Sequence, residues 1–387
     1  MILSPRPWPG VCSLKTNDVP SNLMAENRTS GEHRDLRVTY IGVDSGTSRQ
    51  RAQALERLGL HVTCIDPWAW IGWNKCARYF HLITGYAVAG PLVARRLYAE
   101  VAAARPDVIW VNQGEPLGRK TLTLLRSLDV PIINYANDNP FSSECHRRFT
   151  QYRRALDLYD LVVVVFDTCV PLARAAGARR VIRRHISADE VAHLAYGENS
   201  RPKVYDVSFI GTWHPDGRGD RIVEIIKQGV PLALWGDRWN RDRNWATIRQ
   251  AWRGPGIYGE KEYASVLAES RICLGFVNHL AGNQHTDRST EIPAIGSLLC
   301  AERTAEHEAM YDDGKEAVFW STPEECAGLC ADLLRDEPRR AAIAAAGRRR
   351  AIRNGYFNEQ VLAGVLAELG FDVGSGGRLS AHHQEPA

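Results

Sequence analysis

The chain has 387 residues, of which 44% are hydrophobic and 24% are charged, a composition typical of soluble globular proteins. This length is sufficient for two domains with separate cores. The formal net charge of +3 is small for this length and gives no support for a nucleic-acid partner. Two arginine-rich stretches, residues 179–184 and 348–350, are interpreted as solvated faces, with a nucleic-acid or membrane patch as the alternative.

Nine cysteines are dispersed along the chain without a Cys-x-x-Cys pair. This pattern is typical of reduced, buried thiols and predicts a cytoplasmic protein. Cys326 and Cys330 would share a helix face, but no histidine pair is near them in sequence, so a zinc site is not expected. The sequence has no apolar run of about eighteen residues, so no membrane-spanning helix is predicted. Contact of the protein with a membrane surface stays open. Residues 1–35 and 373–387 are expected to be disordered, because their composition is polar and rich in Pro or Gly.

The first half of the chain alternates apolar runs with helical periodicity. Strands are expected at 37–43, 61–66, 107–111, 131–135, 161–166 and 180–184, and helices at 47–58, around 93–101 and at 117–128. The run 161–166 is entirely apolar, as in a central parallel strand. This alternation predicts a doubly wound parallel α/β domain over residues 36–200.

The pattern breaks at residues 185–202, interpreted as a linker, and then restarts. Strands are expected at 205–211, 231–235 and 272–276, and helices at 218–228, 261–270, 323–353 (two) and 358–369. The stretch 285–320 indicates a loop, a helix start, a buried strand, an acidic helix, a tight turn and a strand. A second domain of the same class, ending in helices, is therefore predicted over residues 203–372.

The most informative residues lie within 285–320. Arg288 and Glu291 are three residues apart and would share one helix face. An arginine at a helix N-terminus suits a phosphate, and a nearby carboxylate suits a ribose hydroxyl. A solvated glutamate and a structural salt bridge of Arg288 with Asp287 or Glu291 are the alternatives. Further candidate contacts to the same ligand are Ser289, Thr290, His285 and Thr286. The pattern predicts a nucleotide-diphosphate ligand at the carboxyl ends of a parallel sheet.

Four short strings in this region carry a family resemblance: Arg288 to Ala294 (RSTEIPA), Gly296, Glu302-Arg303-Thr304 and Gly314 to Phe319. They resemble the CgeB-like (spore maturation protein type) glycosyltransferases, relatives of the group-1 glycosyltransferases. The resemblance covers about residues 37–365 and implies the GT-B fold, two Rossmann-like domains facing a central cleft. It implies transfer of a sugar from a nucleotide-diphosphate-sugar donor to an acceptor hydroxyl. The C-terminal half would bind the donor, and the N-terminal half the acceptor.

Two positions depart from the pattern of these relatives. Many retaining relatives carry a second glutamate eight residues before the ribose-binding one, where this chain has Asn283. Pro293 would interrupt a helix past its first turn. The stereochemical outcome therefore stays open. So do three other functions: a GT-B nucleotide-sugar epimerase, a phosphorylase and a non-catalytic nucleotide-sugar-binding protein. No sequence feature singles out the pyridoxal lysine that a phosphorylase would need.

Other candidate site residues lie at the ends of predicted elements. On the donor side, Gly211 ends a strand in a turn where the backbone could approach the phosphates, Trp235 ends the next strand and could stack on the nucleotide base, and Tyr258 precedes the helix at 261–270, where this fold usually lines the base site. On the acceptor side, the candidates are Asp44, Ser45, Asp138 and Asn139. Asp138 is the candidate base, with turn formation by the Asn-Asp-Asn-Pro sequence as the alternative. A core tryptophan is the alternative for Trp235. Without a Gly-x-Gly-x-x-Gly fingerprint a nicotinamide cofactor is not supported, and without an Asp-x-Asp triplet no essential metal is expected. The nucleotide sugar is then a co-substrate, with no cofactor.

Overall fold

The computed structural model describes residues 36–71, 75–198 and 201–374. These residues belong to one compact unit. The predicted disorder of residues 1–35 falls outside the described residues, as does that of the predicted tail after residue 374.

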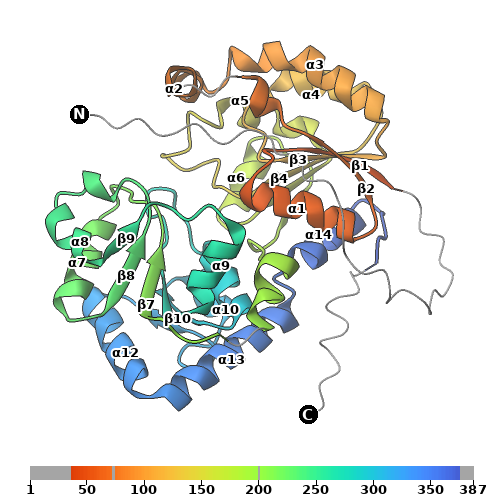
Figure 1. Cartoon of the computed structure of the whole chain (residues 1–387). Coiled ribbons are helices and arrows are strands. Elements are labelled where there is room, and N and C mark those ends of the chain that lie inside the picture. The colour runs from red at the N-terminus through yellow and green to blue at the C-terminus, as the bar shows by residue number, and fades with distance from the viewer. Residues whose placement is uncertain (1–35, 72–74, 199–200, 375–387) are drawn as a thin grey trace, which may run out of the picture. The chain divides into compact units, whose positions relative to one another are not determined.

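The first sheet has six parallel strands in the order β2-β1-β3-β4-β5-β6. Their bounds are β1 (Arg37–Ile41), β2 (His61–Ile65), β3 (Val108–Asn112), β4 (Ile132–Ala136), β5 (Leu161–Val164) and β6 (Val181–Arg183). Every residue of β3, β4 and β5 is buried, because helices cover both faces of the sheet (Figure 1). The strands predicted for the first half are all confirmed, with shifts of one or two residues at their ends.

The second sheet also has six parallel strands, in the order β12-β11-β10-β7-β8-β9. Their bounds are β7 (Tyr205–Ile210), β8 (Leu232–Trp235), β9 (Trp252–Gly254), β10 (Ser270–Gly275), β11 (Leu298–Glu302) and β12 (Val318–Trp320). The short edge strand β9 was not predicted. The prediction of two doubly wound parallel sheets is confirmed.

The helices of the first half are α1 (Gly46–Arg57), α2 (Lys75–Thr84), α3 (Ala89–Ala104), α4 (Arg119–Arg126), α5 (Thr150–Arg153) and α6 (Cys169–Ala175). Those of the second half are α7 (Arg218–Lys227), α8 (Trp245–Ala251), α9 (Glu260–Ala268), α10 (Arg288–Ile295), α11 (Ala305–Met310), α12 (Pro323–Arg335), α13 (Glu337–Asn354) and α14 (Asn358–Ala367). None of these described helices is long and apolar enough to cross a membrane.

Shorter helical turns join the longer elements. The 3-10 turns are Pro67–Trp70, Leu156–Leu158, Tyr196–Glu198 and Trp239–Arg241, and Glu190–Leu194 is a π-helix. The π-helix lies in the segment predicted to be a linker. Asp189 is its N-cap, and the Asp189 carboxylate accepts hydrogen bonds from the backbone N–H groups of Val191 (2.9 Å) and Ala192 (3.0 Å).

The last helix, α14, packs against α1 of the first half (Figure 1). Its apolar residues Val361, Leu362 and Val365 belong to the same hydrophobic core as Leu55 of α1. Beside them, Arg57 of α1 forms ion pairs with three buried carboxylates, those of Asp189, Glu190 and Glu359. The second domain was predicted to extend to residue 372 and so to include α14, and this boundary stays a prediction. The apolar face of α14, however, contributes to the core of the first half.

Candidate functional site

The order of the second sheet reverses between β7 and β10, so the loops after these two strands diverge at their carboxyl ends. In open parallel α/β sheets, ligands bind at such a point. Gly211 follows β7, and residues 276–287 connect β10 to α10. The start of α10 therefore lies where a nucleotide is expected.

Helix α10 begins at Arg288, so Pro293 lies inside the helix and cannot donate to the carbonyl of Ser289. The hydroxyl of Tyr311 donates to that carbonyl instead, at 2.8 Å. The helix ends at Gly296, which has a φ of 86°. Pro293 is thus accommodated without a later helix start, and Arg288 and Glu291 share the first turns as predicted.

Arg288 extends from the first turn of α10 to the end of β7. Its Nε donates to the carbonyl of Ile210 at 3.2 Å, and its guanidinium carbon lies 5.4 Å from the centre of the Tyr263 ring. Its Nη1 forms a salt bridge with Oδ2 of Asp287 at 3.8 Å. The side chain is 28% exposed. The salt bridge with Asp287, given above as the structural alternative for Arg288, is therefore present. Within the described part of the chain, the one hydrogen bond of Arg288 is through Nε, so Nη1 and Nη2 can still donate to an anion.

Glu291 is held by two residues that the sequence did not indicate. Its Oε2 accepts a hydrogen bond from the Tyr263 hydroxyl, and its Oε1 lies 3.7 Å from Nε2 of His193. Nδ1 of His193 accepts from the backbone N–H of Asp189 (2.9 Å), so the ring proton is on Nε2, which faces Glu291. Burial raises the pKa of Tyr263 well above its usual value and keeps the hydroxyl a donor. The Glu291 side chain is only 5% exposed, so the solvated-glutamate alternative is wrong.

The two hydroxyls that follow Arg288 are engaged within the chain. Ser289 Oγ accepts from the backbone N–H of Thr286 (3.0 Å) and lies 2.7 Å from Nε2 of His307. Thr290 Oγ1 donates to the carbonyl of Asp287 at 3.1 Å. In this conformation the hydroxyls hold the start of α10, and the contacts predicted for Ser289, Thr290 and Thr286 stay predictions.

His285 has a different environment from the one predicted. The residue is fully buried, its Nε2 accepts from the backbone N–H of Ile186 (3.1 Å), and its Nδ1 lies 2.5 Å from Glu306 Oε2. The His285 hydrogen bond lowers the pKa of Glu306 against the opposing effect of burial. A donor contact through the His285 ring is therefore not supported, and the residue joins the linker to α11.

Gly211 and Gly236 end neighbouring strands, and their loops pass very close to each other. A Cβ atom on Gly236 would lie 1.9 Å from the Gly211 carbonyl oxygen, which also accepts a hydrogen bond from Trp239 Nε1 at 2.8 Å. Gly236 has a φ of 155°. Glycine is therefore required at position 236, where the loops after β7 and β8 meet, and the predicted phosphate contact at Gly211 stays a prediction.

The two aromatic candidates of the donor half have different environments. Trp235 is half-buried and packs edge-on against Tyr205, with ring centres 5.1 Å apart, which favours the alternative of a core tryptophan. Tyr258 is 73% exposed, and its hydroxyl contacts Asp237. This hydrogen bond raises the pKa of Tyr258 to about 12. A base-binding role stays a prediction for both residues.

The acceptor-side candidates lie in loops after β1 and β4. Asp44 pairs with Arg49 (2.8 Å), and Ser45 precedes α1 and is exposed. Asp138 pairs with Arg148 at 2.8 Å and is 39% exposed. The buried Asn139 donates through Nδ2 to the carbonyl of Ala281 at 2.9 Å, joining the loop after β4 to the loop after β10.

Charges from both halves converge on Asp287, immediately before α10. Burial raises the pKa of Asp287, and the neighbouring Glu291 and Asp138 raise it further, whereas Arg288 and Arg51 oppose this change. Arg51 is buried and lies over the Tyr135 ring at 4.9 Å. No sequence pattern indicated Arg51, because it lies within an otherwise ordinary helix.

Several buried polar atoms near these strand ends have no hydrogen-bond partner among the described residues: Gln113 Oε1, Asn137 Oδ1, Asn283 Oδ1, and Nε and Nη2 of Arg51. Their residues lie after β3, after β4, after β10 and in α1. Unpaired buried polar groups are rare in folded proteins and indicate a missing polar partner. A ligand with many hydroxyl and phosphate groups would supply such partners.

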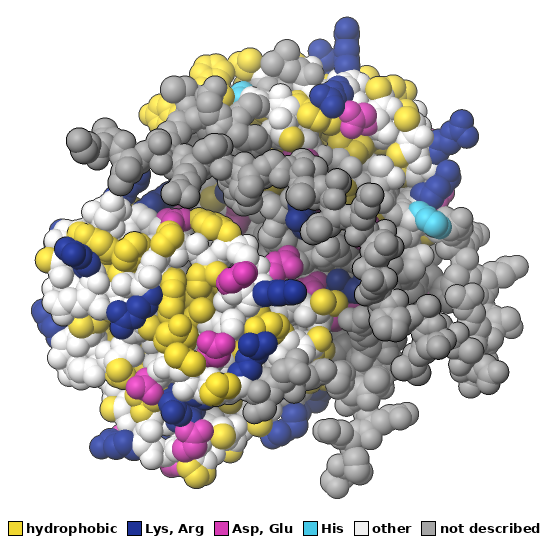
Figure 2. Space-filling view, viewed as in Figure 1, with side chains coloured by type: hydrophobic (Ala, Val, Ile, Leu, Met, Phe, Trp, Pro, Cys, Tyr) yellow, Lys and Arg dark blue, Asp and Glu magenta, His cyan; other side chains and the backbone are white. Residues whose placement is uncertain are grey.

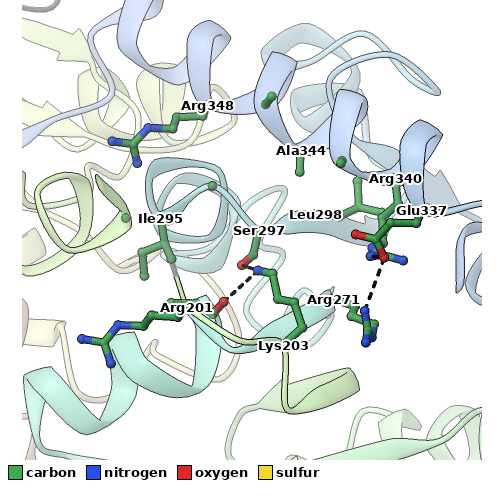
Figure 3. Close-up of a pocket in the computed structure, with 15 residues that line it drawn as sticks. Arg201, Lys203, Arg271, Ile295, Ser297, Leu298, Glu337, Arg340, Ala344 and Arg348 are labelled. Carbon is green, nitrogen blue, oxygen red and sulfur yellow. Dashed lines mark hydrogen bonds and ion pairs between the residues drawn. The ribbon is translucent and has the colours of Figure 1, made fainter. Parts of the chain in front are cut away.

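Two other groups of side chains could bind ligands elsewhere. The sulfur atoms of the buried Cys300, Cys326 and Cys330 lie within 4.8 Å of one another, so tertiary structure adds Cys300 to the pair seen in sequence. A pocket of about 310 Å³ is lined by Arg201, Lys203, Arg271, Arg340, Arg348 and Glu337, among others (Figure 3). It is lined by the end of α10 (Ile295, Gly296) and by Leu298, the first residue of β11, so it lies at the amino ends of the strands, away from Arg288 at the start of α10. Lys203 Nζ donates there to the carbonyls of Ala268 (2.7 Å) and Ser270 (3.0 Å), at the end of α9, a structural use of its charge.

Comparison with known proteins supports the interpretation of the second half. Residues 218–367 match the sequence model of a family described as glycosyl transferase-like. No curated protein matches the chain significantly.

Solved structures show the fold. A sucrose-phosphate synthase from Thermosynechococcus elongatus has 12% identity and a TM-score of 0.63, over 88% of this chain and 100% of that chain. Anabaena HepE in complex with UDP-glucose has 13% identity and a TM-score of 0.57, over 86% and 100%. A UDP-N-acetylglucosamine 2-epimerase has 12% identity and a TM-score of 0.51, over 87% and 98%. The chain thus has the two-sheet GT-B fold and carries a glycosyl transferase-like segment at residues 218–367.

Proposed function

We propose that this protein is a glycosyltransferase that moves a sugar from a nucleotide-diphosphate-sugar donor to an acceptor hydroxyl. The observation that carries the proposal is the first turn of α10. Arg288 there contacts the carboxyl end of β7 at the reversal point of the sheet, and Glu291 follows one turn later. A fork of cationic donors and a fixed carboxylate are the groups needed for a diphosphate and a ribose.

The proposed mechanism is stabilisation of the leaving nucleoside diphosphate. Negative charge develops on the diphosphate as the bond to the anomeric carbon breaks. Arg288 and the N–H groups at the start of α10 neutralise that charge, so the site needs no metal ion for this step. Glu291, oriented by Tyr263 and His193, accepts hydrogen bonds from the ribose hydroxyls.

The acceptor is assigned to the first half, with Asp138 as the group that receives the proton of the acceptor hydroxyl. Its partial exposure and its place after β4 support this role, and its pairing with Arg148 fixes its direction. The adjacent Asn139 Oδ1 accepts from the backbone N–H of Phe141 at 3.0 Å, which supports the turn alternative for the surrounding sequence. Asp138 therefore needs a direct test.

Two further functions share the fold. An epimerase would change a nucleotide sugar without an acceptor, and a UDP-N-acetylglucosamine 2-epimerase is among the similar structures. A non-catalytic binding protein would bind the nucleotide sugar unchanged, and Asn283 in place of a second glutamate is the residue that favours it. The CgeB-like subtype and a cytoplasmic location are parts of the proposal that rest on the sequence pattern.

The experiment has two stages. A panel of nucleotide sugars is screened by thermal shift, because a ligand present at about 100 times its Kd stabilises the folded state by about 2.7 kcal/mol. The stabilising donor is then incubated with the protein, with and without sugar acceptors, and the products are separated. Release of nucleoside diphosphate with a glycosylated or hydrolysed product supports transfer. Conversion to an isomeric nucleotide sugar identifies an epimerase, and binding without any product identifies a binding protein.

A further inference from the structure

Arg51, in the second turn of α1, carries a buried positive charge that forms no ion pair with any carboxylate of the described residues. It is only 1% exposed. Its Nη1 donates to Oδ1 of Asn112 at 3.4 Å, a long hydrogen bond, and its guanidinium carbon lies 4.9 Å from the centre of the Tyr135 ring. Nε and Nη2 are buried and have no hydrogen-bond partner in the described part of the chain. Burial raises the pKa of Asp287, and Arg51 opposes this rise from beyond ion-pair distance.

Other arginines of the first half are neutralised by carboxylates. Arg148 pairs with Glu115 at 2.6 Å, and Arg49, on the same helix as Arg51, pairs with Asp44 at 2.8 Å. On the surface, Figure 2 shows Lys and Arg side chains lying among Asp and Glu side chains, where water also screens their charge. A buried charge without a partner is costly, so buried charges in folded proteins are normally paired. Arg51 therefore indicates a missing anion.

The guanidinium of Arg51 lies near the carboxyl ends of two neighbouring strands of the first sheet. Asn112 is the last residue of β3, and Tyr135 is the last but one of β4. Ligands of open parallel sheets bind at this edge. The next residues along the chain, Gln113 after β3 and Asn137 after β4, each have a buried side-chain oxygen without a described partner. Amide oxygens accept hydrogen bonds from hydroxyls, so this edge lacks both an anion and hydroxyl donors.

The backbone at Gln113 is strained. Its φ is 68°, in the left-handed region that is unfavourable for a residue with a Cβ atom. Its N–H donates to the carbonyl of Tyr135 at 2.8 Å, and its carbonyl accepts from Nδ2 of Asn134 at 2.8 Å. These two contacts hold the strained residue beside the end of β4. Backbone strain that the surroundings maintain is concentrated at binding and catalytic sites, which agrees with the unpaired polar atoms here.

Arg51 belongs to a different sheet from the residues assigned to the donor. Arg288 contacts the carbonyl of Ile210 at the end of β7, in the second sheet. Gln50, next to Arg51, donates through Nε2 to Oε1 of Glu260 in α9 at 3.3 Å, so this part of α1 borders the second half. The charge of Arg51 is therefore available to a ligand other than the donor diphosphate.

We propose that Arg51 binds an anionic group of the acceptor, so that the acceptor is a hydroxylated acid such as a sugar phosphate or a uronic acid. The guanidinium fork matches a phosphate or a carboxylate, and the side-chain oxygens of Gln113 and Asn137 accept from hydroxyls of the same molecule. Because Arg51 is closed to water in this structure, the anion reaches it through a movement of the surrounding loops. The identification of this ligand as the acceptor rests on the proposed function, but anion binding by Arg51 does not.

The test is isothermal titration of the full chain with glucose 6-phosphate and with glucuronate, and glucose is the neutral control. Each titration is repeated with saturating UDP. We expect one of the two anions to bind about tenfold or more tightly than glucose, the effect of a charge-assisted hydrogen bond. The stronger of the two anions shows whether Arg51 prefers a phosphate or a carboxylate. The binding should persist with UDP present. If neither anion binds more tightly than glucose, the proposal is overturned.

Variants assign the binding to Arg51. Arg51→Met should weaken binding of the anion about tenfold or more and leave the Kd of UDP unchanged. Its unfolding midpoint without ligands should be equal or higher, because a buried unpaired charge is removed, whereas a purely structural role would lower it. Arg51→Lys keeps the charge but loses the fork, and it should also weaken anion binding if the Met variant does not fold. The control Arg49→Met removes an arginine that is 49% exposed and should bind like the unmodified protein.

The remaining outcomes separate this proposal from the proposed function. If UDP displaces the sugar anion, or if Arg51→Met weakens UDP and the anion equally, Arg51 belongs to the diphosphate site and the proposal fails. It also fails if the Arg51 variants bind the anion as the unmodified protein does. If no nucleoside diphosphate binds, but the sugar anion binds and requires Arg51, the donor site is wrong and the anion site stands.

Discussion

Replacement of Glu291 by glutamine is the most direct test of the proposed donor site. The change keeps the size of the side chain and one carbonyl oxygen for the Tyr263 hydroxyl, but it removes the negative charge. Each carboxylate oxygen has two acceptor positions, so the contacts of Tyr263 and His193 leave positions for two ribose hydroxyls. Glutamine retains one acceptor and places an N–H₂ group where a hydroxyl would donate.

The magnitude follows from the loss of one charge-assisted hydrogen bond in a site that is almost closed to water. Such a bond contributes about 1.5–3 kcal/mol, so the Kd of a nucleoside diphosphate should rise by about 10- to 150-fold. The Glu291 side chain is 5% exposed, which places the effect in the upper part of this range, because water cannot replace the lost contact.

The assay is isothermal titration with UDP and with 2′,3′-dideoxyuridine diphosphate, and with the adenosine and guanosine pairs if uridine does not bind. Glu291→Gln should raise the Kd of UDP. The Kd of the dideoxy analogue, which lacks both ribose hydroxyls and already binds weakly, should stay unchanged. Glu308→Gln, which alters an exposed carboxylate paired with Arg303 (2.7 Å), is the control and should bind normally. Equal weakening of both ligands by Glu291→Gln would refute a ribose contact, and unchanged affinity for both would remove Glu291 from the site.

Four further predictions follow from other residues. Arg288→Lys keeps the charge but loses the fork, so turnover should fall about 10-fold or more, whereas normal turnover would make Arg288 structural. Transfer should survive EDTA, and loss of activity that magnesium or manganese restores would contradict charge neutralisation by Arg288 and α10 alone. Asp138→Asn should lower the transfer rate and leave the donor Kd unchanged, and an equal loss of donor affinity would contradict its role as base. Burial, with repulsion from Glu359, raises the pKa of Glu190 in the folded protein to about 8. The unfolded chain releases this proton near pH 4.5, whereas the folded protein keeps it up to about pH 8, so the free energy of unfolding should fall between these two pH values. Glu190→Gln should flatten that fall in urea unfolding at pH 5, 6.5 and 8, and an unchanged slope would refute the assignment.

Much of the fold was predictable because its signals are local. Apolar runs such as 161–166 and 205–211 predict strands, and the segments between such runs have the periodicity of helices. This alternation predicts parallel βα units. The edge strand β9 and the helices α5, α6 and α8 were missed because they have only three to seven residues, and the ten-residue helix α2 was missed as well. The resemblance of residues 288–319 to a glycosyltransferase pattern indicated Arg288 and Glu291 together, and the structure places both in the first turns of α10.

The sequence by itself determined the class of each element and the composition of α10, because these depend on residues a few positions apart. Contacts between distant residues were decided only by the tertiary structure. Tyr263 and His193 reach Glu291 from positions 28 and 98 residues earlier in the chain, Cys300 joins Cys326 and Cys330, and α14 returns to pack on α1. His285, predicted at the donor, became a buried link to Glu306 for the same reason. The contacts of a side chain depend on which loops the strand order brings together at one edge of the sheet. Hydrophobic periodicity predicts the type of each element but not the order of the strands.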